Sequence, residues 1–119
     1  MNQTTIREPV MVRGVNVYDG KANAITFRPA AENTGLSFIV NSIPIKATLE
    51  NAEYQKRAIA VKHNGACAQL VEHVLSAVYA LGLDNLTMEL SDGVVPTHDF
   101  CIITPRTNGT QNSLGICTQ

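Results

Sequence analysis

The stretch that decides the fold is Gln69-Leu70-Val71-Glu72-His73-Val74-Leu75-Ser76-Ala77-Val78-Tyr79-Ala80-Leu81-Gly82. Its apolar residues recur at intervals of three and four, the spacing that gathers side chains on one face of a helix. The polar residues follow the same spacing on the opposite side, and they are Gln69, Glu72, His73 and Ser76. Gly82 stands where a left-handed C-cap belongs, with Leu83 after it. We therefore predict an amphipathic helix over residues 69–81.

The segments on either side of this helix alternate between apolar and polar residues, as strands do. Clear strands are expected at residues 6–12, 25–29, 36–40 and 86–90, and weaker ones at 43–47 and 57–61. Pro9 marks an edge or a bulge in the first of them. Turns are expected at Asn33-Thr34-Gly35, Asn64-Gly65 and Ser91-Asp92-Gly93. Strands with one strong helix predict an α+β fold, a two-layer sandwich in which one helix covers a small, mostly antiparallel sheet.

Composition excludes several classes of function. The chain has 119 residues, of which 45% are hydrophobic and 16% charged, as in one ordinary globular domain. Its net charge is −1 and it holds three Phe, three Tyr and no Trp, so neither a phosphate-binding surface nor a base-stacking platform is indicated. We expect no nucleic-acid partner. No apolar run approaches the roughly 18 residues of a membrane span, so we expect none.

Three cysteines occur, Cys67, Cys101 and Cys117, and no two form a C-x-x-C pair. We expect reduced thiols in a cytoplasmic protein. The first eight residues show no secretory-signal pattern. Cys67 has two interpretations, a thiol of lowered pKa near a helix N-terminus or a small buried hydrophobic residue, and we prefer the second.

A change of composition divides the chain into residues 1–99 and a C-terminal tail, residues 100–119. The tail contains a single charged residue, Arg106, and is rich in Thr, Asn, Gly and Ser. Pro105 interrupts any helix there. We expect one folded domain followed by a tail of different character.

Glu72 and His73 are the sharpest chemical feature. Both stand near the predicted helix N-terminus, whose partial positive charge favours an ionised carboxylate and a neutral imidazole. Neutral imidazole binds metals, and a nearby carboxylate can accept a proton from a metal-bound water. The pair therefore suits metal-assisted hydrolysis. The competing interpretation is a solvated helix face, on which adjacent Glu and His often occur by chance.

Several blocks of sequence resemble one family in their order and spacing, from about residue 4 to residue 99. The blocks are Thr5–Val10 with Gly14 and Gly20, Arg28–Ala30, Asn33–Phe38, Val71–Ala77, Leu81–Asn85, and Pro96 with Asp99. They are similar to the amino-terminal half of the zinc-dependent UDP-3-O-acyl-N-acetylglucosamine deacetylases of lipid A biosynthesis. The resemblance implies a half-domain of the ribosomal S5 domain 2-like fold, which in the family has two helices over its sheet.

The resemblance also implies roles for the Glu-His pair. It makes His73 one of three zinc ligands and Glu72 the general base on the zinc-bound water. In the family the other two ligands come from an H-x-x-x-D motif in the second half of the enzyme. The 119 residues contain no such motif, because Cys67, Ala77 and Ile102 stand four residues after the three histidines. A catalytic zinc needs about three protein ligands, so we expect the chain to be catalytically incomplete alone.

The chain departs from the family pattern at three places. Tyr18 stands where the family has a histidine near the substrate. Gln69-Leu70 replaces a Ser-Thr pair that would cap the helix, a loss of about 1 kcal/mol. The sequence His98-Asp99-Phe100-Cys101 leads into the tail instead of a second helix.

Other interpretations stay open. His63, His73 and His98 with Asp99 or a cysteine would form a local zinc site, although their spacing fits no standard one. The chain would otherwise be a non-catalytic module that forms a homodimer, pairs with a missing second half, or binds a UDP-sugar or an acyl chain. The last alternative is an isolated fragment without a separate role.

Overall fold

A computed structural model describes residues 3–55, 58–96 and 116–119. Its main element is a five-stranded sheet in the order β2-β3-β9-β4-β5. The strands are β2 (Val10–Val15), β3 (Ala22–Pro29), β9 (Leu86–Leu90), β4 (Leu36–Val40) and β5 (Ile43–Lys46). Neighbours pair antiparallel except β4 and β9, which are parallel. Because parallel strands need a crossover, all of residues 41–85 must connect these two.

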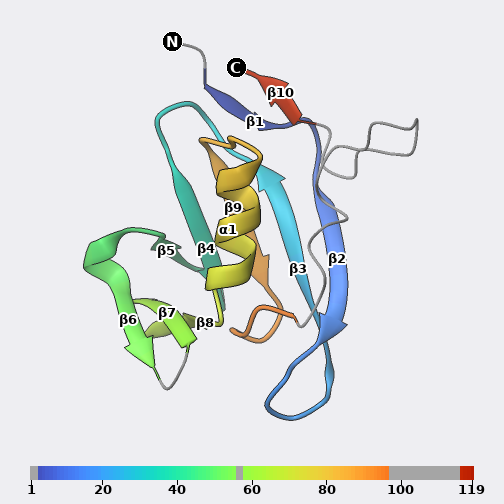
Figure 1. Ribbon diagram of the computed structural model, residues 1–119, viewed down its shortest axis with the longest axis vertical. Helices are drawn as coiled ribbons and strands as arrows, with labels where there is room; N and C mark the ends of the chain where they lie inside the picture. The colour runs from blue at the N-terminus through green and yellow to red at the C-terminus, as the bar shows by residue number, and fades with distance from the viewer. Residues whose placement is uncertain (1–2, 56–57, 97–115) are drawn as a thin grey trace.

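The helix α1 (Glu72–Ala80) lies across one face of this sheet (Figure 1). Alternate residues of β3, β4 and β9 point toward it and are buried, as the period of two requires. From the helix, the three valines Val71, Val74 and Val78 are fully buried in the same core. Burying a side chain of that size contributes roughly 1.5–3 kcal/mol. The predicted α+β sandwich, with one helix over a mostly antiparallel sheet, is confirmed.

Two smaller sheets complete the described part of the chain. A three-stranded sheet is formed by β6 (Ala52–Gln55), β7 (Ala58–His63) and β8 (Ala66–Gln69), preceded by a 3-10 turn, η1 (Leu49–Asn51). At the other end of the molecule, β1 (Thr4–Ile6) pairs antiparallel with β10 (Ile116–Thr118), so the two termini lie together (Figure 1). Among the described residues, no helix is long and apolar enough to cross a membrane.

The helix begins three residues later than predicted. Gln69 belongs to β8, and its N–H donates to the Gly93 carbonyl at 2.9 Å. Leu70 has a left-handed backbone, with φ of 60°, which a right-handed helix cannot contain. The helical spacing of Leu70 therefore reflects its partial burial beside the core and not helical backbone.

Strand boundaries also differ from prediction in places. The single strand expected at residues 6–12 is two strands, β1 and β2, separated around Pro9, which has no N–H to donate. The strands β6, β8 and β10 were not predicted. Each has three or four residues, too few for alternation to distinguish it from a loop.

The predicted C-cap is confirmed. Gly82 has φ of 72°, its N–H donates to the Tyr79 carbonyl at 3.0 Å, and the N–H of Leu83 donates to the Val78 carbonyl at 3.3 Å. These are the two bonds of a Schellman motif. Leu83 is buried, so the cap also turns the chain into the core toward β9.

The buried side chain of Asn85 joins four separate segments. Its Oδ1 accepts from the N–H groups of Thr34 and Gly35, at 3.2 and 2.8 Å. Its Nδ2 donates to Oε1 of Gln3 at 2.6 Å and to Oε1 of Gln119 at 2.7 Å. An amide offers two donors and about two acceptor sites, so its capacity is fully used.

We expect Asn85→Ala to lower the free energy of unfolding by about 3 kcal/mol, because it leaves several partly buried groups without partners. Urea unfolding followed by circular dichroism measures this. Asn51→Ala is the matched control, since Asn51 donates one exposed side-chain bond, to the Lys46 carbonyl; its expected cost is at most about 1 kcal/mol. Equal costs for the two variants would contradict the role of Asn85.

Candidate functional site

Glu72 and His73 occupy the first turn of α1, as predicted. Glu72 is half-buried and His73 is exposed. Oε1 of Glu72 lies 3.4 Å from the backbone nitrogen of Ile59 in β7, which donates to it. The carboxylate is therefore directed toward β7, while the imidazole faces outward without a hydrogen-bond partner among the described residues.

The start of the helix is held by backbone bonds. Gln69-Leu70 precedes the cap position instead of occupying it; the N-cap residue is Val71, which supplies no side-chain bond. Instead, its N–H donates to the Ile59 carbonyl at 3.1 Å. Ile59 thus contacts both Val71 and Glu72 through its backbone. The middle strand of the small sheet consequently positions the Glu-His pair.

A second segment supports the same turn from the other side. Gln69 and Val94 form a parallel bridge, in which the N–H of Val95 donates to the Gln69 carbonyl at 3.0 Å. Gly93 in this segment has φ of 82°, and a Cβ there would lie 3.1 Å from the Cys67 carbonyl oxygen. Only glycine fits this conformation and approach, so the predicted turn at Ser91-Asp92-Gly93 is required by the packing below the helix start.

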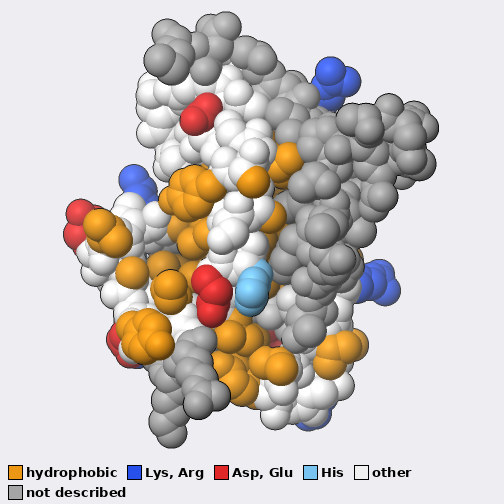
Figure 2. All heavy atoms as spheres, in the orientation of Figure 1, with side chains coloured by type: hydrophobic (Ala, Val, Ile, Leu, Met, Phe, Trp, Pro, Cys, Tyr) orange, Lys and Arg blue, Asp and Glu red, His pale blue; other side chains and the backbone are white. Residues whose placement is uncertain are grey.

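The surroundings of the pair are apolar. Figure 2 shows an acidic side chain and a histidine side by side on the face that carries α1, with hydrophobic side chains around them. Ile59 is 38% exposed there, and Leu75, one turn along the helix, is half-buried. The pair therefore stands on a partly apolar area of the surface.

The described His, Cys, Asp and Glu side chains do not complete the zinc site that the resemblance implies. Within residues 3–55, 58–96 and 116–119, no three His, Cys, Asp or Glu side chains lie close enough together to hold a metal ion. A catalytic zinc requires about three protein ligands. The exposed imidazole of His73 is a suitable nitrogen ligand. The described residues therefore supply one ligand of a zinc site and not a complete set.

The other predicted residues lie apart from this pair or outside the description. His63 is exposed at the end of β7, before the Asn64-Gly65 turn. Tyr18 is 62% exposed in the loop between β2 and β3, where its N–H donates to Oδ1 of Asn16 at 2.8 Å. His98 and Asp99 lie outside the described residues.

Cys67 is not at the helix N-terminus, because it lies within β8. Burial raises the pKa of its thiol, with a smaller opposing effect from the charge of Lys62. The thiol is also free of any disulfide. Of the two interpretations, a small residue packed as a hydrophobe is the one that agrees with this placement.

Sequence reasoning did not identify Ile59 as part of the site. Ile59 acts through its backbone, and its partner Glu72 is 13 residues away, so no local pattern indicates the contact. Sequence reasoning also did not predict the hydrogen bonds of the Asn85 side chain, because their partners lie in distant segments.

Comparison with known proteins agrees with this geometry. Residues 3–101 match the family described as UDP-3-O-acyl N-acetylglycosamine deacetylase. The UDP-3-O-acyl-N-acetylglucosamine deacetylase of Bdellovibrio bacteriovorus is 33% identical over 101 residues, which cover 82% of this chain and 33% of the relative. The proteins of the same name from Chromohalobacter salexigens and Chlamydia trachomatis are each 34% identical, over 83% and 82% of this chain and 34% and 35% of the relative. The chain spans about a third of the length of these relatives.

We expect the purified 119-residue chain to keep far less than one zinc per chain after dialysis, because a single imidazole binds the ion weakly. Elemental analysis of the protein, and of a His73→Ala variant as control, makes the measurement. One tightly held zinc per chain, or per two chains, that disappears in His73→Ala would contradict the expectation.

Proposed function

This chain belongs to the UDP-3-O-acyl-N-acetylglucosamine deacetylase family, and we propose that it supplies the amino-terminal part of an amide-hydrolysing site whose remaining residues lie outside the 119. The observation that supports this most directly is the placement of Glu72 and His73. They stand together at the accessible end of the only helix in the described part of the chain, within the segment that matches the family. Residues 1–99 are the proposed family domain, and residues 100–119 a divergent tail.

The two side chains have different proposed roles. Glu72 is held through Ile59 with its carboxylate near the surface, where it acts as the base that takes a proton from an attacking water. His73 is free to extend outward, and it contributes one nitrogen ligand to zinc when the other ligands are provided. The zinc would polarise the amide carbonyl and lower the pKa of a bound water.

The expected outcome is that the chain alone, with added zinc, releases no acetate from UDP-3-O-acyl-N-acetylglucosamine above a blank without protein. A chimera in which residues 3–101 replace the matching third of the Chlamydia trachomatis relative is expected to release acetate. In the chimera, Glu72→Gln should lower kcat by about 10²–10⁴, the usual contribution of a general base. His73→Ala should also abolish most of the activity.

Ser76→Ala in the same chimera is the matched control, because Ser76 is exposed one turn from His73 on α1; its activity should not change. Acetate release by the isolated chain that His73→Ala removes would contradict catalytic incompleteness. A folded chimera in which Glu72→Gln and His73→Ala keep full activity would contradict the assigned roles.

A second candidate function, self-association, is favoured by the apolar side chains on the helix side of the molecule (Figure 2). Ile59 is partly exposed beside the helix start, and Tyr79 is 64% exposed on its last turn. Val17 and Tyr18 are exposed in the loop that joins β2 and β3. Soluble monomers rarely leave large apolar patches uncovered, and a second copy would cover such a patch with closed symmetry.

We expect a homodimer at micromolar concentration by light scattering, and Ile59→Lys should shift it to a monomer. Met11→Lys is the control, because Met11 is 56% exposed on the opposite face of the sheet. A chain ending at Asp99 tests the alternative that the tail covers this surface. A full-length monomer that associates only after this truncation would contradict dimerisation and identify the tail as the cover.

A further inference from the structure

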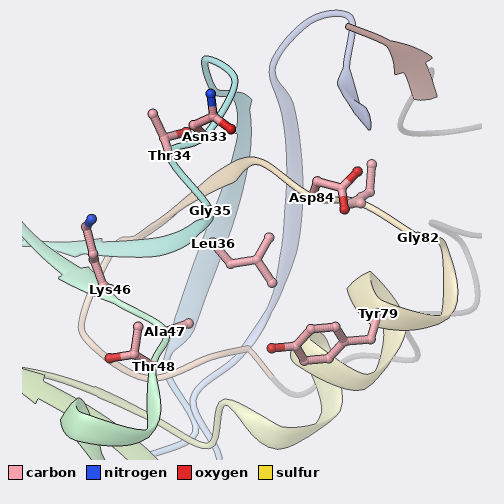
Figure 3. A pocket seen from close by; sticks show the side chains of 11 residues that line it. Asn33, Thr34, Gly35, Leu36, Lys46, Ala47, Thr48, Tyr79, Gly82 and Asp84 are labelled. Atoms are coloured by element: carbon pink, nitrogen blue, oxygen red, sulfur yellow. The ribbon is translucent and has the colours of Figure 1, made fainter. Parts of the chain in front are cut away.

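A groove of about 580 Å³ lies between the last turn of α1 and the β4–β5 edge of the large sheet (Figure 3). It is formed by three segments: the loop that leads into β4, the residues that end β5, and the residues that follow the helix. Sites for small molecules commonly have volumes of about 300–1,000 Å³. The groove is separate from Glu72 and His73, which lie at the other end of the helix.

The floor and one wall of the groove are apolar. Leu36 at the start of β4 and Leu83 after the helix cap both line it, and they are 9% and 3% exposed. Tyr79 extends from the last turn of α1 with its ring across from the β5 side (Figure 3). An exposed tyrosine over two leucines offers a flat apolar contact for a ligand, with a hydroxyl at its edge.

The two ends of the groove carry opposite charges. Lys46, at the end of β5, and Asp84, after the helix, line it on opposite sides of Leu36 (Figure 3). Among the described residues neither side chain forms an ion pair; Asp84 accepts one bond through Oδ2, from the N–H of Thr4 at 2.9 Å. The helix C-terminus, with its partial negative charge, stands beside Asp84 and favours a cation at that end.

The wall between these ends is rigid. Thr34 and Gly35 donate their N–H groups to the buried Asn85, and Asn33 exchanges two bonds with Gln3, at 2.8 and 2.6 Å. A wall ordered before binding lowers the entropy cost of holding a ligand. The groove is therefore preformed instead of being shaped by its occupant.

We propose that this groove binds a small zwitterionic molecule whose ammonium and carboxylate groups are separated by an apolar body. The carboxylate pairs with Lys46, the ammonium with Asp84 and the helix C-terminus, and the apolar body lies on Leu36 and Leu83 under Tyr79. A simple anion pairs with Lys46 and leaves Asp84 without a charged partner. A simple cation pairs with Asp84 and leaves Lys46 without one. The proposal does not depend on the proposed deacetylase role.

The test is a titration of the full 119-residue chain with ω-amino acids from 4-aminobutanoate to 8-aminooctanoate, followed by the amide shifts of Leu36, Tyr79 and Leu83 in NMR spectra. One length is expected to bind best, up to about fivefold tighter than the alkylamine and the alkanoate of equal length, because an exposed ion pair is worth up to that factor. Lys46→Met and Asp84→Asn should each remove about the same factor. Asp84→Asn keeps an oxygen to accept from Thr4.

Lys21→Met is the control, since Lys21 is an exposed lysine in the β2–β3 loop, away from the groove; its binding should match that of the unchanged chain. Alkylamines or alkanoates that bind as tightly as the zwitterions would overturn the proposal. So would the absence of any shift at Leu36, Tyr79 and Leu83 across the series, or binding that Lys46→Met and Asp84→Asn leave unaltered.

Discussion

The fold depends on one saturated amide. Asn85 is 1% exposed, and its side chain holds Gln3 before β1, Gln119 after β10 and the loop before β4. Its backbone also takes part, because its carbonyl accepts from Oγ1 of Thr5 at 2.6 Å. Its partners belong to segments that are distant in sequence. A buried amide that uses all its bonds specifies one arrangement of these segments, because any shift would leave a group unsatisfied.

Asn85 also stands at the start of the parallel pairing between β4 and β9. It immediately precedes Leu86, whose N–H donates to the Gly35 carbonyl at 3.0 Å, and Leu86 pairs with Leu36. With β4 and β9 aligned in the same direction, the connection between them must return along the sheet, and α1 makes that return. The helix therefore runs from the β7–β8 end toward the Asn85 end. Glu72 and His73 reach the surface beside Ile59 because of this direction.

Much of this architecture was predictable where the signal is local. Alternation identified β3, β4 and β9, since alternate residues of each are buried in the core, and the spacing of Val71, Val74 and Val78 identified the helix face. Gly82 identified the helix end. The helix start was mispredicted because Leu70 keeps the apolar spacing while its backbone is left-handed. Helical spacing placed the Glu-His pair near the helix start, and its role as a site stays a prediction. Its support by Ile59 was not predicted, because a bond between a side chain and a backbone group 13 residues away leaves no local pattern.

The two ends of α1 border different features, the Glu-His pair and the groove, and the helix keeps them apart. Nine residues at about 1.5 Å each place its ends roughly 13 Å apart, which exceeds the screening length of about 8 Å at physiological ionic strength. A charge change at Lys46 or Asp84 is thus largely screened from Glu72 and His73. What the ends share is mechanical, since both are fastened to strands by backbone bonds: Val71 to Ile59 of β7 at the start, and Asp84 and Asn85 to the Thr4 carbonyl of β1 after the cap. A change that loosens β1 would therefore affect the groove directly, and would reach the Glu-His pair only through movement of the whole helix.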